Sequence, residues 1–131
     1  MPQFNFHRQF AADVEAGTKR QTVRARRKHT PRVGQVAHCF TGLRTTSSRL
    51  LGRFPITGVR PIFIFVCGTI LLGETGAEKV LEGTVEELSA DAADSFARLD
   101  GFETAAEFVE WIREHHGLPF KGHVTVWDPE G

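Results

Sequence analysis

The sequence of 131 residues lacks the features that identify several common classes of protein. It contains no tyrosine and only two cysteines, Cys39 and Cys67, and it has neither the Cys-x-x-Cys nor the His-x-x-x-His spacing that is typical of zinc sites. Both cysteines lie in apolar, strand-like segments, so we expect buried thiols in a reducing cytoplasm rather than a disulfide. We therefore predict a protein that uses no metal and no cofactor.

Long hydrophobic runs are also missing. The most apolar run, residues 62–72, is interrupted by Gly68 and Thr69 and is far shorter than the roughly 20 residues that a membrane-spanning helix needs. We expect it to be a buried strand, although the sequence assigns it no role. The N-terminal residues Met-Pro-Gln-Phe-Asn-Phe-His do not resemble a signal or transit peptide. These features predict one cytoplasmic domain over residues 1–131 with no membrane partner.

Acidic residues are scarce in the first half of the chain. Residues 1–65 contain 12 Lys and Arg but only Asp13 and Glu15, a net charge of +10, and the other 66 residues carry −10. Ten of the 12 cations are arginine, whose forked guanidinium group binds phosphate and stacks on bases. This asymmetry predicts a basic face for a polyanion. The alternative is that the two halves neutralise each other across the domain.

The basic charge is densest at residues 17–28, which read Gly-Thr-Lys-Arg-Gln-Thr-Val-Arg-Ala-Arg-Arg-Lys. If this segment is a strand from Lys19 onward, its side chains divide into two faces. One face carries Thr22, Arg24, Arg26 and Lys28, and the other carries Gln21, Val23, Ala25 and Arg27. Since the second face holds the apolar residues, we expect it to meet the core. A hydroxyl group and three cations would then line the opposite surface, with Lys19 at its entry.

The remaining strands are expected to be short. Alternating Phe4 and Phe6 indicate a first strand, and Gly17 is expected to end a helix over residues 10–14. The hydrophobic pattern predicts further strands at residues 36–40, 50–59, 61–65, 80–81 and 123–127. Arg44 and Arg49 lie in a small, polar stretch, residues 41–49, which is either a solvated hairpin tip or a clamp on a ligand backbone.

Two helices are expected in the acidic half. Ser89 is the predicted N-cap of a helix over residues 90–99. Thr104 and Glu107 form a capping-box pattern before a helix that runs to about His115. Together the elements predict an α+β fold: a partly open mixed β-barrel of about five to six strands with flanking helices.

Four motifs in this order resemble an ASCH domain of the PUA-like β-barrels. They are Gly17-x-Lys19-x-x-Thr22-x-Arg24, Pro31-x-x-Gly34, Asp100-Gly101-Phe102 and the ending from Pro119-Phe120-x-Gly122 to Trp127. The resemblance spans nearly the whole chain. It implies a barrel with a cleft beside the first motif, and RNA or modified nucleosides as ligands.

The resemblance also implies a possible reaction. Some small ASCH proteins are amidohydrolases that remove the acetyl group of N4-acetylcytidine with a Lys, a Thr and a Glu. The matching positions are Lys19 as base, Thr22 as nucleophile, and Asp100 in place of the longer Glu. Asp100 would protonate or orient the leaving amine, and Arg24 would offer donors to an oxyanion. The alternative is that Lys19 and Thr22 hold phosphate while Asp100 caps a turn.

The function predicted from these observations is binding of RNA or a nucleoside in a basic cleft around residues 19–26. The expected ligand-binding residues are Arg20, Arg24, Arg26, Arg44 and Arg49, beside the candidate catalytic residues Lys19, Thr22 and Asp100. The alternatives are an amidohydrolase acting on N4-acetylcytidine or a related acylated nucleoside, and a ribonuclease. The sequence does not distinguish RNA from single-stranded DNA.

Overall fold

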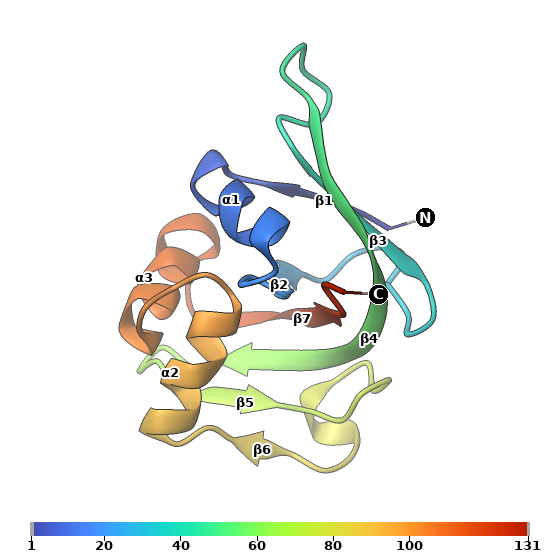
Figure 1. The fold of residues 1–131 in the computed structure, drawn as a ribbon. Coiled ribbons are helices and arrows are strands. Elements are labelled where there is room, and N and C mark those ends of the chain that lie inside the picture. The colour runs from blue at the N-terminus through green and yellow to red at the C-terminus, as the bar shows by residue number, and fades with distance from the viewer. Residues whose placement is uncertain (1, 131) are drawn as a thin grey trace.

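The structure, a computed structural model, describes residues 2–130, except for the side chain of Glu82, and has an α+β fold (Figure 1). Seven strands form one mixed sheet. The elements in chain order are β1 (Gln3–Phe6), α1 (Arg8–Ala16), β2 (Gln21–Ala25), β3 (Val36–Thr41), β4 (Arg49–Ile64), β5 (Ile70–Leu72), the 3-10 helix η1 (Val80–Glu82), β6 (Glu86–Glu87), α2 (Ala90–Leu99), α3 (Ala105–His116) and β7 (Phe120–Trp127).

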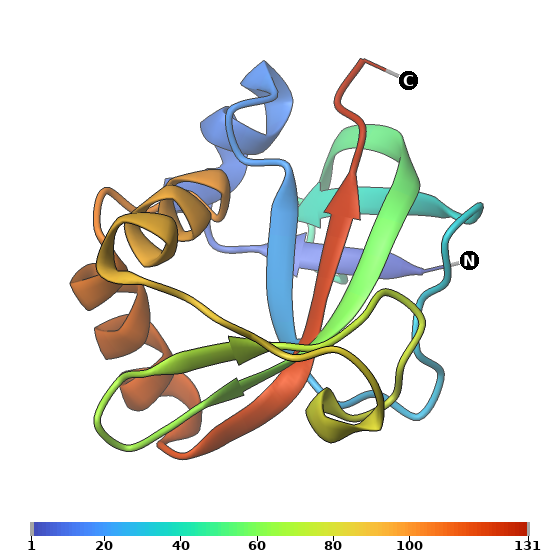
Figure 2. The same cartoon turned by 90° about the horizontal axis from the view of Figure 1, so that it is seen from below.

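The long strand β4 organises the sheet. Its first half pairs with β3 and its second half with β7 and β5, because the strand bends where its register with β7 shifts between Ile56 and Gly58. Figure 2 shows β2 and β7 side by side, with β1 running across behind them. β1 and β3 are the only parallel pair among the described strands.

The α+β class is confirmed, the sheet is not closed into a barrel, and it has seven strands where about five to six were expected. Within residues 2–130, β1 pairs only with β3, and β2 pairs only with β7. A seam without backbone hydrogen bonds therefore separates β1 from β2. We call this gap the β1–β2 seam.

Two apolar clusters hold the helices on the sheet. One joins α2 and α3 to the second half of β4, to β5 and to β7, and includes Phe96, Phe108 and Ile112. The other lies under α1 and includes Phe4, Phe6, Phe10 and Trp127. Figure 1 shows all three helices along one side of the sheet. Trp111 on α3 contacts Phe10 on α1 at 5.2 Å between ring centroids and so connects the two clusters.

The helix ends agree with the predicted caps. Ser89 Oγ accepts a hydrogen bond from Ala92 N, and Thr104 Oγ1 accepts one from Glu107 N, each at 3.2 Å. Gly17 ends α1 with a left-handed φ of 80°, as expected. The capping box differs in one respect, since the Glu107 carboxylate accepts from Glu103 N.

Some strand predictions were wrong. Residues 80–82 form a 3-10 helix instead of a strand. The β structure expected over residues 50–65 is confirmed as the continuous strand β4. The apolar run at residues 62–72 is buried at its two ends, but its middle is an exposed turn that carries Val66, which is 66% exposed. Cys39 is buried as expected, whereas Cys67 lies on this turn and is exposed. Over residues 2–130, no helix combines the length and apolar character needed to cross a bilayer.

Candidate functional site

Strand β2 holds the side chains of the site in place, because its first residues are buried on both faces of the strand. Gln21, Thr22 and Val23 are buried, Arg24 is half-buried and Ala25 is exposed. The tight antiparallel contact with β7 needs glycine at one position, since a Cβ on Gly122 would lie 2.1 Å from the Arg24 carbonyl oxygen. The two-face prediction was therefore correct for Val23 but wrong for Thr22, which is buried, and for Ala25, which is exposed.

Two arginines from the β2 segment bridge the β1–β2 seam. Arg24 donates to the backbone oxygen of Asn5 at 2.8 Å, and Arg27 donates to that of Gln3 at 2.7 Å. The Arg27 guanidinium lies 4.6 Å from the centroid of the Phe4 ring, and that of Arg24 lies 5.0 Å from the Phe6 centroid. Arg27 was expected on the core face. Because β2 ends at Ala25, the strand alternation does not reach it, and its side chain turns toward β1 instead.

A cavity of about 380 Å³ lies on one side of Arg24, and we call it the aromatic cavity. The four polar residues that the first and third sequence motifs singled out all line it: Lys19, Thr22, Arg24 and Asp100. Its apolar walls include four aromatic side chains: Phe6, Phe10, Phe102 and Trp111. Asp100 follows α2 and is far in sequence from Lys19 and Thr22. The structure brings all three residues to one concave surface.

The ammonium group of Lys19 lies deep in this site, with the residue 3% exposed. It donates to the backbone oxygens of Asp100 at 2.6 Å and Gln21 at 3.0 Å, and lies 3.4 Å from Asp100 Oδ2. The bond to Asp100 ties the entry of β2 to the C-terminal end of α2. The rings of Phe6 and Phe10 lie 5.4 and 5.1 Å from Nζ.

Burial shifts both members of this pair toward their neutral forms. It lowers the pKa of Lys19, aided by the charge of Arg24 and opposed by Asp100. Burial likewise raises the pKa of Asp100, while Lys19 and the hydrogen bond from Gln21 oppose the rise. The two hydrogen bonds from Lys19 Nζ to backbone carbonyl oxygens need only two N–H groups. A charged ammonium group and a neutral amine can therefore both make them.

The Thr22 hydroxyl is held by its neighbour on the same strand. Thr22 Oγ1 accepts a hydrogen bond from Arg24 Nε at 2.8 Å. Within residues 2–130 its own proton donates to no acceptor, and the hydrogen bonds of Lys19 go to Asp100 and Gln21 instead of Thr22. The hydroxyl is thus free to donate to a ligand in the cavity.

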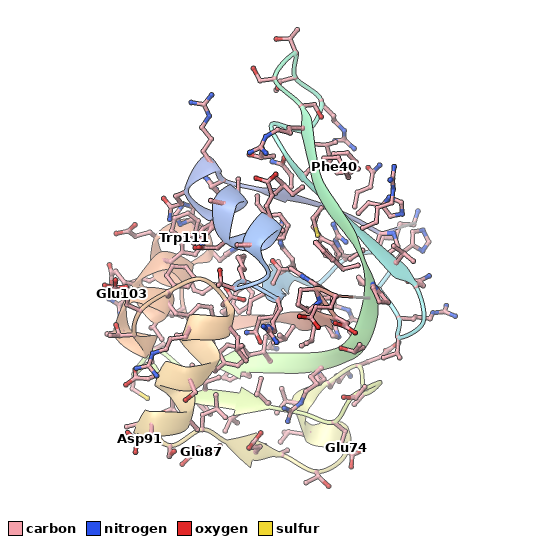
Figure 3. All side chains as sticks on the ribbon, viewed as in Figure 1. Phe40, Glu74, Glu87, Asp91, Glu103 and Trp111 are labelled. Carbon is pink, nitrogen blue, oxygen red and sulfur yellow. The ribbon has the colours of Figure 1, made fainter. Side chains whose placement is uncertain are left out.

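Histidines and a tryptophan form one rim of the aromatic cavity. His115 stacks on Trp111, with centroids 3.8 Å apart and planes 23° from parallel, and His7 meets Trp111 edge-on at 4.9 Å. His115 Nδ1 donates to the Trp111 carbonyl at 2.8 Å, which fixes the ring. Figure 3 shows Trp111 between α1 and α3. The sequence carried one signal for this stack, since residues 111 and 115 are one helical turn apart.

A second cavity of about 580 Å³ adjoins the first, and Asn5 and Arg24 line both. Arg27 and Arg44 also line this second cavity, which we call the arginine groove. Of the predicted ligand-binding residues, Arg24 and Arg44 therefore reach a cavity. Asn5, Arg27 and the aromatic walls were not predicted.

The other three predicted arginines lie elsewhere. Arg20 donates to the Gly17 carbonyl at 3.1 Å, and Arg49 pairs with Glu15 at 2.6 Å. Arg26 has a side chain 62% exposed and lies 3.7 Å from a Glu78 carboxylate oxygen. None of the three lines either cavity. The basic segment is consequently divided between the two cavities and the solvated surface.

The described residues contain no cluster of three or more His, Cys, Asp or Glu placed to hold a metal ion. No protein-family model, curated protein or solved structure significantly matches the chain.

Replacing Asp100 by Asn tests the buried pair. We expect this change to lower the free energy of unfolding by about 3 kcal/mol near neutral pH, because Lys19 is left as an unpaired buried charge. Lys19 has a lower pKa in the folded than in the unfolded chain, so the unfolded chain binds more protons between these two values. The variant should regain stability as the pH rises toward 10.5, the ordinary lysine value.

Denaturant unfolding at several pH values measures this effect. Asp91→Asn, at an exposed position in the first turn of α2, is the control and should cost less than about 1 kcal/mol. Equal losses for the two variants would show that the Lys19–Asp100 contact does not support the site.

Proposed function

We propose that the protein binds a nucleoside, free or within single-stranded RNA, in the aromatic cavity. We further propose that it is a cytoplasmic ASCH-type domain, and that its open sheet is a PUA-like arrangement in which the β1–β2 seam leaves the barrel unclosed. One observation carries the binding proposal: Lys19, Thr22, Arg24 and Asp100 line a single cavity with aromatic walls.

The size and lining of the cavity suit a small planar ligand. Its volume of about 380 Å³ lies within the usual range for small-molecule sites. Ligand sites of this kind combine apolar walls with a few well-placed polar groups, as in this cavity. Bases stack on aromatic side chains and are read through hydrogen bonds to their edges. Trp111 and Phe102 supply rings for stacking.

The polar groups offer both donors and acceptors to a base edge. The free hydroxyl proton of Thr22 suits a base carbonyl oxygen, and the Asp100 carboxylate suits an exocyclic amine. Arg24 is fixed by its bonds to Thr22 and Asn5, so its position is set before a ligand enters. This pre-organisation reduces the entropy lost on binding.

Replacing Trp111 by Ala tests the stacking role. We expect nucleoside affinity to fall by at least about fivefold, because base stacking on an aromatic residue contributes ~1–3 kcal/mol. Isothermal titration with a panel of the four ribonucleosides and N4-acetylcytidine measures the change. Phe65→Ala is the control, since Phe65 is 41% exposed on the β4–β5 turn and lines neither cavity.

Binding that is unchanged in Trp111→Ala, or weakened equally in Phe65→Ala, would contradict the cavity as the nucleoside site. Thermal unfolding of both variants checks that each remains folded at the titration temperature.

The pKa shifts favour a second candidate, an amidohydrolase acting on N4-acetylcytidine or a related acylated nucleoside. In that reaction the Thr22 oxygen bonds to the acyl carbon while its proton passes to Lys19, and the carbon–nitrogen bond breaks as Asp100 protonates the leaving amine. Water then cleaves the acyl ester. The step requires neutral Lys19 and protonated Asp100, and burial shifts the pKa of each residue in that direction. The ribonuclease alternative stays a prediction.

Substitutions at two cavity residues test the second candidate. Thr22→Val keeps the branched shape without the nucleophilic oxygen, so we expect no cytidine from N4-acetylcytidine, while Asp100→Glu restores the longer acid and should raise the rate. Chromatography of the reaction mixture measures cytidine. If neither the wild type nor Asp100→Glu releases cytidine, the amidohydrolase candidate is wrong and the binding proposal is unaffected.

A further inference from the structure

We propose that the arginine groove binds a phosphate group attached to the nucleoside in the aromatic cavity, so that the ligand is a nucleotide, free or within an RNA strand. This inference rests on the proposed function. The two cavities share Asn5 and Arg24 in their linings, which makes Arg24 the point where base and phosphate would meet.

The groove is lined by three arginines and by no carboxylate. Five other cations in residues 2–130 each lie within ion-pair distance of a carboxylate: Lys19, Arg26, Arg49, Arg60 and Arg113. Arg24, Arg27 and Arg44 have no such partner in the described chain, and the lining of the groove contains no Asp or Glu. Three guanidinium groups around one concavity therefore favour an anion.

Two of the three arginines of the groove are held in place by contacts with β1, whereas the side chain of Arg44 is exposed. The carbonyls of Asn5 and Gln3 and the rings of Phe4 and Phe6 hold the guanidinium groups of Arg24 and Arg27. Each guanidinium has more N–H donors than these bonds use. The remaining donors are available to phosphate oxygens.

Arg24 and Arg27 also repel each other. Burial and the charge of Arg27 lower the pKa of Arg24 to about 10. Burial lowers the pKa of Arg27 as well. An anion between the two would relieve this repulsion, which is the electrostatic reason for expecting a ligand there.

The third arginine is brought to the groove by the β3–β4 loop. Leu43 N donates to Asn5 Oδ1 at 2.9 Å, which ties the loop to β1. Arg44 follows with a left-handed φ of 68°, a conformation that non-glycine residues rarely adopt. The loop thus contributes Leu43 and Arg44 to the lining of the groove, and the volume of about 580 Å³ leaves room beyond one phosphate.

Binding measurements with matched probes test the inference. The first probe is a nucleoside that binds in the titration panel, or cytidine if none of the panel binds. The other probes are the 5′- and 3′-monophosphates of that nucleoside, inorganic phosphate and a short single-stranded RNA. We expect at least one monophosphate or the RNA to bind about tenfold more tightly than the nucleoside, as charge-assisted hydrogen bonds predict. Arg27→Ala should remove this advantage, because it deletes one of the guanidinium groups that line the groove.

Two further variants make the test specific. Arg44→Gly removes a charge at a position whose backbone suits glycine, so it should fold and still weaken phosphate binding. Arg26→Ala removes the same charge from the adjacent residue, which is exposed and outside the groove, and should have little effect. For RNA, Arg27→Ala should reduce the salt slope of log affinity by about 0.7.

The outcomes separate the two proposals. Equal affinities for the nucleoside, both monophosphates and RNA, or equal losses in Arg26→Ala and Arg27→Ala, would overturn the arginine groove while leaving the nucleoside site standing. Phosphate-dependent binding that requires Arg27 but shows no contribution from Trp111 would support the groove and contradict the nucleoside site. Binding of RNA that is lost in Arg27→Ala, without binding of either monophosphate, would support the groove and identify the strand as the source of the phosphate. Failure of every probe to bind would overturn both proposals.

Discussion

The gap between β1 and β2 is the constraint on which both cavities depend. Backbone hydrogen bonds across this seam would close the sheet and fill the space that the cavities occupy. Instead, Arg24 and Arg27 satisfy the outer carbonyls of Asn5 and Gln3 with their side chains. A guanidinium group spans a wider gap than a backbone pair and retains spare donors. The seam is therefore bridged and remains able to accept a ligand.

The aromatic cavity also depends on the link between β2 and α2. Lys19 reaches from the entry of β2 to Asp100, the C-cap residue of α2, and Gly101 then turns the chain toward Phe102 and α3 with a left-handed φ of 95°. A buried ion pair is seldom more stabilising than apolar packing of the same volume. The presence of this pair within a cavity is better explained by what it offers a ligand than by stability.

The sequence predicted the helix caps correctly and some of the residues that line the two cavities. Helix caps at Ser89 and Thr104 depend on adjacent residues, and the structure confirms them. The site prediction divided a basic segment by strand alternation, which misplaced Thr22 and Ala25 within β2 and does not apply after Ala25, where β2 ends. Arg27 was thus missed as a lining residue, while Arg26 and Arg49, which were predicted to bind ligand, line neither cavity and pair with Glu78 and Glu15. Such pairings join residues distant in sequence, so local patterns do not reveal them.

A crystal structure of the protein with a ribonucleotide dimer tests the central claim most directly, because it locates base and phosphate at once. The account predicts one base inside the aromatic cavity against Trp111 or Phe102, and the connecting phosphate within hydrogen-bond distance of Arg24 and Arg27. A dimer bound on the exposed surface around Arg20 and Arg26, with both cavities empty, would contradict it.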